Sequence, residues 1–178
     1  MQNDLAAILA TAQFAAERHV KQKRKGKAAE PYINHLIEVA HLVSCALSEP
    51  DANLVMAAFL HDTVEDVGVT ADELRERFGT DVTALVLEVT DDKSLPQEER
   101  KRLQVEHAPH LSVRAATIKL ADKISNLRSM LVSPPADWPY ERIRDYFAWG
   151  EQVVSGIPQP NPVLKAEFDL TVKRFDKP

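Results

Sequence analysis

The chain has 178 residues, of which 44% are hydrophobic and 28% charged, as in an ordinary globular protein long enough for one domain with a substantial core. Its 22 Lys and Arg against 27 Asp and Glu give a net charge of −5, which argues against a nucleic-acid partner, because such proteins usually carry a basic domain. No apolar run approaches the roughly 18 residues that cross a bilayer, and the N-terminus lacks a signal-peptide pattern. We therefore expect a cytoplasmic protein without a membrane partner. The single cysteine, Cys45, excludes an intramolecular disulfide, and its apolar neighbours predict a buried thiol.

Nearly every segment shows the periodicity of a helix, and the sequence predicts an all-α fold of roughly eight to ten helices in a single domain, residues 1–178. Helix ends are marked by Pro31 and Pro50, by a capping box at Thr70, and by Ser112. A basic loop is expected over residues 21–30. The expected helices lie at residues 3–19, 31–49, 52–67, 70–78, 80–89, 96–107, 112–130, 140–154 and 162–175. The aromatic side chains Trp138, Phe147 and Trp149 are expected in the core.

The most informative segment is His61-Asp62, followed by Glu65 and Asp66 and then by the stop signal Gly68. Read as the end of one continuous helix, it places three carboxylates where the helix dipole already contributes negative charge. Such a cluster costs stability unless a cation lies among the acids. The simplest cation is a divalent metal ion.

Two further residues could complete a metal site. His35 lies on the preceding helix, and Asp122 interrupts the apolar face of the helix expected over residues 112–130. Taken alone, each has a simpler interpretation, as a hydrogen-bonded core histidine and as an aspartate in a salt bridge or cap. Together with His61 and Asp62 they form a mixed nitrogen and oxygen set that suits Mn²⁺, Fe²⁺ or Zn²⁺.

The order His35, His61-Asp62, Asp122 resembles the HD-domain superfamily of metal-dependent phosphohydrolases. A longer set of motifs resembles the hydrolase domain of RelA/SpoT-type enzymes, and most closely the stand-alone small alarmone hydrolases such as the metazoan SpoT homologues. The similarity runs from about residue 14 to at least residue 150. The matching segments are Arg24-Lys25, residues 30–35, 61–66, 89–93, 120–123 and 126–128.

The resemblance implies an HD-type helical bundle that holds one metal ion, typically Mn²⁺, through His35, His61, Asp62 and Asp122. It implies that Glu65 and Asp66 orient and activate water, which a carboxylate near a metal can do by accepting a proton. It also implies that Arg24, Lys25 and Asn126 contact the nucleotide. Arg142 and Tyr146, four residues apart, could reach the 5′ phosphates or serve in packing. Leu36 stands where many relatives have proline, so we expect a straight helix there.

The implied activity is hydrolysis of the 3′-diphosphate of ppGpp and pppGpp to GDP or GTP and pyrophosphate, without synthetase activity. Two alternatives stay open. A phosphate pocket of this kind could accept another nucleotide, such as NADPH or a deoxynucleotide monophosphate. A module that senses a nucleotide without turnover is disfavoured by Glu65 and Asp66, because a pure binder needs no water-activating pair.

Overall fold

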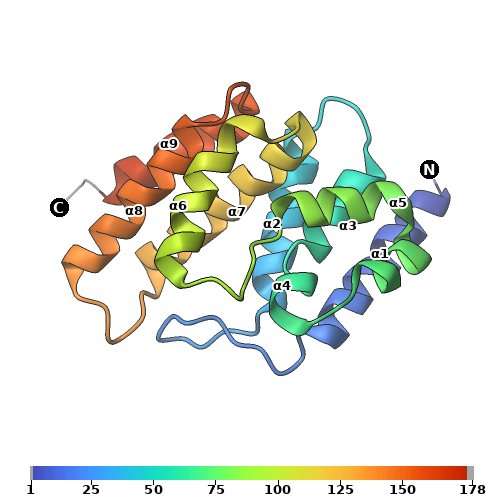
Figure 1. Cartoon of the computed structure of the whole chain (residues 1–178), viewed down its shortest axis with the longest axis horizontal. Coiled ribbons are helices and arrows are strands. Elements are labelled where there is room, and N and C mark those ends of the chain that lie inside the picture. Colours follow the sequence, from blue (N-terminus) through green and yellow to red (C-terminus); the bar gives the residue numbers. More distant parts are fainter. Residues whose placement is uncertain (1, 176–178) are drawn as a thin grey trace.

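The computed structural model describes residues 2–175, and within them the secondary structure is helical apart from one isolated bridge between Lys23 and Pro31 (Figure 1). The all-α prediction is therefore confirmed. The helices are α1 (Gln2–Arg18), α2 (Ile33–Ala46), α3 (Ala52–Leu60), α4 (Thr63–Val67), α5 (Ala71–Val89), α6 (Gln97–His107), the 3₁₀ helix η1 (Ala108–His110), α7 (Val113–Val132), α8 (Tyr140–Ser155) and α9 (Pro162–Phe175).

Helices α2, α3 and α7 form the centre of the bundle, because α2 packs against both of the others. Helices α1 and α5 pack on α3, whereas α8 and α9 pack on α7, so that the two groups flank the centre in Figure 1. Leu36, Leu60, Leu120 and Leu127 are fully buried in this core. Apolar packing thus fixes the positions of α2, α3 and α7, and with them the positions of the polar residues on these helices.

The expected helix starts are confirmed at two positions. The Thr70 hydroxyl accepts a hydrogen bond from the Glu73 backbone N–H at 3.1 Å, and the Ser112 hydroxyl accepts one from Ala115 at 3.2 Å. The two helices expected on either side of Gly79 form one element, α5. It is kinked at Gly79, whose positive φ of 83° favours a residue without a side chain.

The segment around His61 differs from the expected continuous helix. Helix α3 ends at Leu60, Asp62 has non-helical angles (φ −101°, ψ 0°), and α4 begins at Thr63. Glu65 and Asp66 therefore lie in the first turn of a new helix, where the dipole favours negative charge. The argument that these acids crowd a helix C-terminus was wrong. The expected stop at Gly68 is present, in the left-handed conformation with φ 71°.

Two expectations about burial were also wrong. Cys45 is exposed, because the buried stripe of α2 runs through neighbours such as Leu42 and Ala46 on another side of the helix. Phe147 is buried as expected, but Trp138 and Trp149 are only partly buried and line a cavity. Within residues 2–175, none of the helices combines the length and apolar character needed to cross a bilayer.

The core position next to His35 gives a test of this packing. Leu36→Ala removes a fully buried side chain and should lower the free energy of unfolding by about 2–5 kcal/mol. The neighbouring Ile37 is half exposed, so Ile37→Ala serves as the matched control and should cost less than about 1 kcal/mol. Urea unfolding measures both values, and equal losses would contradict the described packing of α2.

Candidate active site

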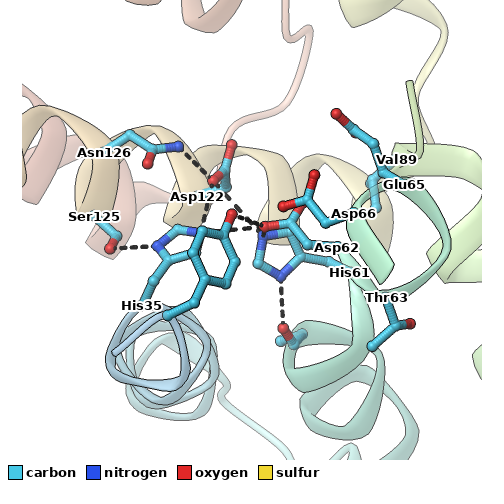
Figure 2. Close-up of polar contacts among 12 residues, drawn as sticks. His35, His61, Asp62, Thr63, Glu65, Asp66, Val89, Asp122, Ser125 and Asn126 are labelled. Atoms are coloured by element: carbon cyan, nitrogen blue, oxygen red, sulfur yellow. Dashed lines mark hydrogen bonds and ion pairs between the residues drawn. The ribbon is translucent and has the colours of Figure 1, made fainter. Parts of the chain in front are cut away.

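A cavity of about 380 Å³ opens between the turn that joins α3 to α4, the basic loop, and helices α6, α7 and α8. Four of the residues predicted from the sequence meet here. His61, Asp62 and Asp122 line the cavity, and the buried His35 lies next to both carboxylates (Figure 2). The Nε2 atom of His61 lies 3.0 Å from Asp62 Oδ2 and 3.7 Å from Asp122 Oδ1. The Nε2 atom of His35 lies 3.5 Å from Asp62 Oδ2 and 3.3 Å from Asp122 Oδ1. Ligand atoms of His35, His61 and Asp62 lie within 4.8 Å of one another, and Asp122 adjoins both imidazoles.

The other ring nitrogen of each histidine is held by the protein. His61 Nδ1 lies 2.8 Å from the carbonyl oxygen of Ala58, which can only accept, so Nδ1 carries the proton. His35 Nδ1 lies 2.8 Å from Ser125 Oγ, whose own proton is donated to Glu38 at 2.6 Å, so His35 Nδ1 donates as well. In the neutral form of each ring, Nε2 then carries the lone pair. Both Nε2 atoms are buried without a hydrogen-bond partner.

The two carboxylates are oriented by neutral donors. The Tyr32 hydroxyl donates to Asp62 Oδ2 at 2.6 Å, and the Asn126 amide donates to Asp122 Oδ1 at 2.6 Å. Burial opposes ionisation of Asp62, but the facing His61 holds the pKa of Asp62 well below its usual range. Burial likewise opposes ionisation of Asp122, and the charge of Lys123 holds its pKa well below the usual range. Both groups are therefore ionised.

This arrangement fits a divalent cation. Two imidazole lone pairs and two carboxylates converge, and hydrogen bonds from a surrounding layer of side chains fix the direction of each, as in protein metal sites generally. Burial opposes a charge on His61, but Asp62 and Asp122 outweigh it and raise the pKa of His61.

Glu65 also lines the cavity, next to Asp66 (Figure 2). Its Oε2 accepts the Asp91 backbone N–H at 3.2 Å, and its Oε1 lies 3.4 Å from Arg100 Nη1. Burial raises the pKa of Glu65 to about 7, and the charges of Asp62 and Asp91 add to the effect. Glu65 therefore exchanges a proton near neutral pH, which suits a general base.

Asp66, beside Glu65, is held on both oxygens. Gln22 donates to Oδ2 at 2.7 Å, and the Lys93 ammonium donates to Oδ1. Lys93 also lies 3.6 Å from Glu65 Oε1. Burial opposes the charge on Lys93, but Asp66 and Glu65 outweigh it and raise its pKa. The carboxylate pair thus has a fixed orientation.

The basic loop reaches the cavity because it is anchored to the end of α7. Gly26 lies so close to this end that an added Cβ would stand 2.1 Å from the Ser133 carbonyl oxygen. Arg24 Nη1 donates to Ser125 Oγ at 3.2 Å, and Nη2 donates to Asn126 Oδ1 at 3.1 Å. Arg24, Lys25 and Asn126 all line the cavity, and their contact with a nucleotide stays a prediction.

Arg142 and Tyr146 both lie on α8, but only Tyr146 lines the cavity. Tyr146 lines the cavity between Trp138 and Trp149, with ring centroids 5.7 and 5.3 Å away. Arg142 is exposed and stacks on Trp138, with Cζ 4.2 Å from the ring centroid, and it is not among the lining residues. Arg142 therefore adjoins the site through Trp138.

Several polar residues of the site escaped the sequence interpretation. Their roles depend on contacts across 30 to 90 residues of chain, which no local pattern reports. Tyr32 lies within residues 30–35, one of the segments that match the RelA/SpoT-type hydrolases, and only that match could have identified it as a site residue. The residues missed are Gln22, Tyr32, Arg100, Lys119, Lys123 and Ser125.

The comparisons with known proteins agree with this geometry. The HD domain matches residues 11–144. The chain is 47% identical to the protein named guanosine-3′,5′-bis(diphosphate) 3′-pyrophosphohydrolase MESH1 of Xenopus tropicalis, over 95% of this chain and 94% of that protein. It is also 47% identical to the human protein of that name, over 93% and 92% of the two chains.

A solved structure described as a metazoan orthologue of SpoT that hydrolyses ppGpp superposes with a TM-score of 0.90, at 43% identity and 95% coverage of both chains. The resemblance stated from the motifs is thereby confirmed. The HD-domain match implies that the chain binds a divalent metal ion, and His35, His61 and Asp62 form a cluster that could hold one. The chain belongs to the HD-domain family, in the group of the MESH1 proteins.

Proposed function

We propose that this protein hydrolyses ppGpp and pppGpp to GDP or GTP and pyrophosphate, with Mn²⁺ held by His35, His61, Asp62 and Asp122. The observation that carries the proposal is the charge of the cavity. Eight basic and five acidic side chains line it, although the chain as a whole has a net charge of −5. A surplus of positive charge beside a metal cluster suits a substrate with two diphosphate groups. The named activity of the MESH1 relatives supports the same substrate.

The bound ion would supply Lewis acidity, which lowers the pKa of water and offsets negative charge on phosphoryl oxygens. Glu65 accepts a proton from the water that attacks the phosphorus joined to the ribose 3′ oxygen. The bond from this phosphorus to the 3′ oxygen breaks, the oxygen leaves with the electron pair and takes up a proton, and pyrophosphate is released. Asp66, fixed by Gln22 and Lys93, orients the water.

Other lining residues bind the nucleotide. Lys25, on the basic loop, contacts a phosphate group. Arg24 donates a hydrogen bond to Asn126 Oδ1 and so fixes this side chain in the cavity wall. Tyr146 and the neighbouring Trp138 offer aromatic faces for a base. We further propose that residues 1–178 act as a single domain, which is supported by the packing of α1 and α9 on the central helices.

The carboxylate pair gives the first test. Glu65→Ala combined with Asp66→Ala should lower kcat for ppGpp by at least about 10³-fold, because proton acceptance and water orientation are both lost. Mn²⁺ should still bind, since neither residue belongs to the metal cluster. The control is Asp72→Ala, which removes an exposed acid of α5. Turnover of ppGpp by the double variant at the parent rate would show that the mechanism is wrong.

The support of His35 gives a second test. Ser125→Ala removes the acceptor that fixes the proton on His35 Nδ1 and should weaken Mn²⁺ binding roughly 10–100-fold. Ser129→Ala, one turn further along α7, is the matched control and should bind Mn²⁺ like the parent. Isothermal titration calorimetry measures both dissociation constants. An unchanged dissociation constant in Ser125→Ala would exclude the assigned role of this hydroxyl.

The pKa of Glu65 predicts the pH dependence. An acid with a raised pKa stays protonated to higher pH, so a base that must be ionised gains activity as the pH rises through that pKa. The value is about 7 without metal, and a bound cation lowers it. The acid limb of kcat/KM should therefore level off below pH 7 in the parent and be absent from the residual activity of Glu65→Gln. An acid limb at the same pH in the parent and in Glu65→Gln would show that another group causes it.

A further inference from the structure

A buried histidine lies behind the cavity, at the end of α1. His19 follows the last residue of this helix, its side chain is almost fully buried, and it is not among the residues that line the cavity. Its backbone N–H still donates to the Ala15 carbonyl oxygen at 3.0 Å. The imidazole stacks on the Tyr32 ring, with centroids 5.2 Å apart and planes at 15°. This stacking fixes the plane of the imidazole, and with it the direction of both ring nitrogens.

One ring nitrogen of His19 faces Gln22, which does line the cavity. His19 Nδ1 lies 2.6 Å from Gln22 Oε1, and Gln22 Nε2 donates to Asp66 Oδ2 at 2.7 Å. The other oxygen of Asp66 accepts from the Lys93 ammonium, so this carboxylate presents lone pairs to Gln22. The amide therefore turns its nitrogen to Asp66 and its oxygen to His19. Because an amide oxygen only accepts, the proton of the His19 ring lies on Nδ1.

The second ring nitrogen of His19 has a cost. Among the described residues, its Nε2 is buried without a hydrogen-bond partner. A phenyl ring would fill the same space without leaving a buried acceptor unsatisfied. Burial also lowers the pKa of His19, although the hydrogen bond to Gln22 and two nearby carboxylates oppose the effect, so the ring is neutral. A buried polar atom kept at such a cost requires an explanation, and the Nδ1 proton offers one.

The Nδ1 proton acts on a side chain whose backbone is already fixed. The Gln22 N–H donates to the His19 carbonyl oxygen at 2.9 Å, and the Tyr32 N–H donates to the Gln22 carbonyl oxygen at 3.1 Å. What stays adjustable is the rotation of the Gln22 side chain. Without the His19 proton, the Gln22 oxygen loses the donor that holds it, and the amide can turn away from Asp66.

We propose that His19 is a positioning residue for the hydrolysis, because its Nδ1 proton fixes the Gln22 amide, which in turn holds Asp66 in the orientation that directs water. We name His19 and Gln22 the Asp66 support. The inference rests on the proposed function and adds a residue that touches neither the substrate nor the metal cluster. Asp66 acts on water during the chemical step, so the Asp66 support contributes to kcat and leaves the binding of substrate and metal unchanged.

A double-mutant cycle tests the Asp66 support. His19→Phe keeps a ring that can stack on Tyr32 but lacks the Nδ1 proton, and Gln22→Met lacks the amide. Each should lower kcat for ppGpp roughly 10–100-fold with KM unchanged, because misplacing a catalytic group has an effect of this size. Since His19 acts through Gln22, the double variant should be no slower than Gln22→Met alone. The matched control is Arg18→Met, the preceding residue, whose guanidinium contacts Glu73 away from the cavity.

The cycle separates positioning from packing. If His19 served only to pack the end of α1, its loss would combine with that of Gln22, and the double variant would fall by the product of the two factors. That result, or a kcat of His19→Phe equal to that of Arg18→Met, would overturn the proposal. Calorimetric titration with Mn²⁺ adds a second reading. Weaker Mn²⁺ binding in His19→Phe than in Arg18→Met would show that His19 acts on the metal cluster instead, and would also overturn it.

The proton position provides a test that does not depend on turnover. Long-range ¹H–¹⁵N NMR spectra of the metal-free parent chain at pH 7 should show the His19 proton on Nδ1 and none on Nε2. The Gln22 side-chain amide should exchange with water at least about 10-fold more slowly in the parent than in His19→Phe. If the parent shows this pattern but does not hydrolyse ppGpp, the proposed function fails and the orientation of Gln22 by His19 stands. If hydrolysis is present but the proton lies on Nε2, or Gln22 exchanges equally fast in both chains, the Asp66 support is overturned.

Discussion

Two imidazoles converge with two carboxylates in this protein, and the site depends on this arrangement. The Nδ1 proton of His61 is committed to a carbonyl oxygen and that of His35 to Ser125, so both Nε2 lone pairs face the carboxylates of Asp62 and Asp122. Burying such a set without a cation is costly. A divalent ion would satisfy all four groups at once.

The backbone conformation between α3 and α4 helps to bring these groups together. A continuous helix would direct neighbouring side chains about 100° apart, whereas the break after Leu60 lets His61 and Asp62 face one point. The same break starts α4, which presents Glu65 and Asp66 beside the cluster. Burial then brings the pKa of Glu65 to about 7, where the group can take a proton from water. The break after Leu60 thus lets His61 and Asp62 face one point and places Glu65 and Asp66 beside them.

The sequence predicted the all-α fold and most helix boundaries, because apolar periodicity, caps and prolines are local signals, as Thr70 and Ser112 illustrate. It also predicted the four residues that meet in the cluster, but only through the motif set, since spacing alone left His35 and Asp122 ambiguous. The turn at His61 was missed because no glycine or proline marks it. The exposed Cys45 shows a related limit: apolar neighbours along a helix do not tell which side a residue faces.

The central claim is that His35, His61, Asp62 and Asp122 bind one metal ion. Anomalous diffraction from crystals grown with Mn²⁺ and without chelator tests it most directly. The account predicts a single manganese peak at about 2.0–2.3 Å from one atom of each of the four residues. A peak bound elsewhere, or a cluster that stays free of metal at saturating Mn²⁺, would contradict it.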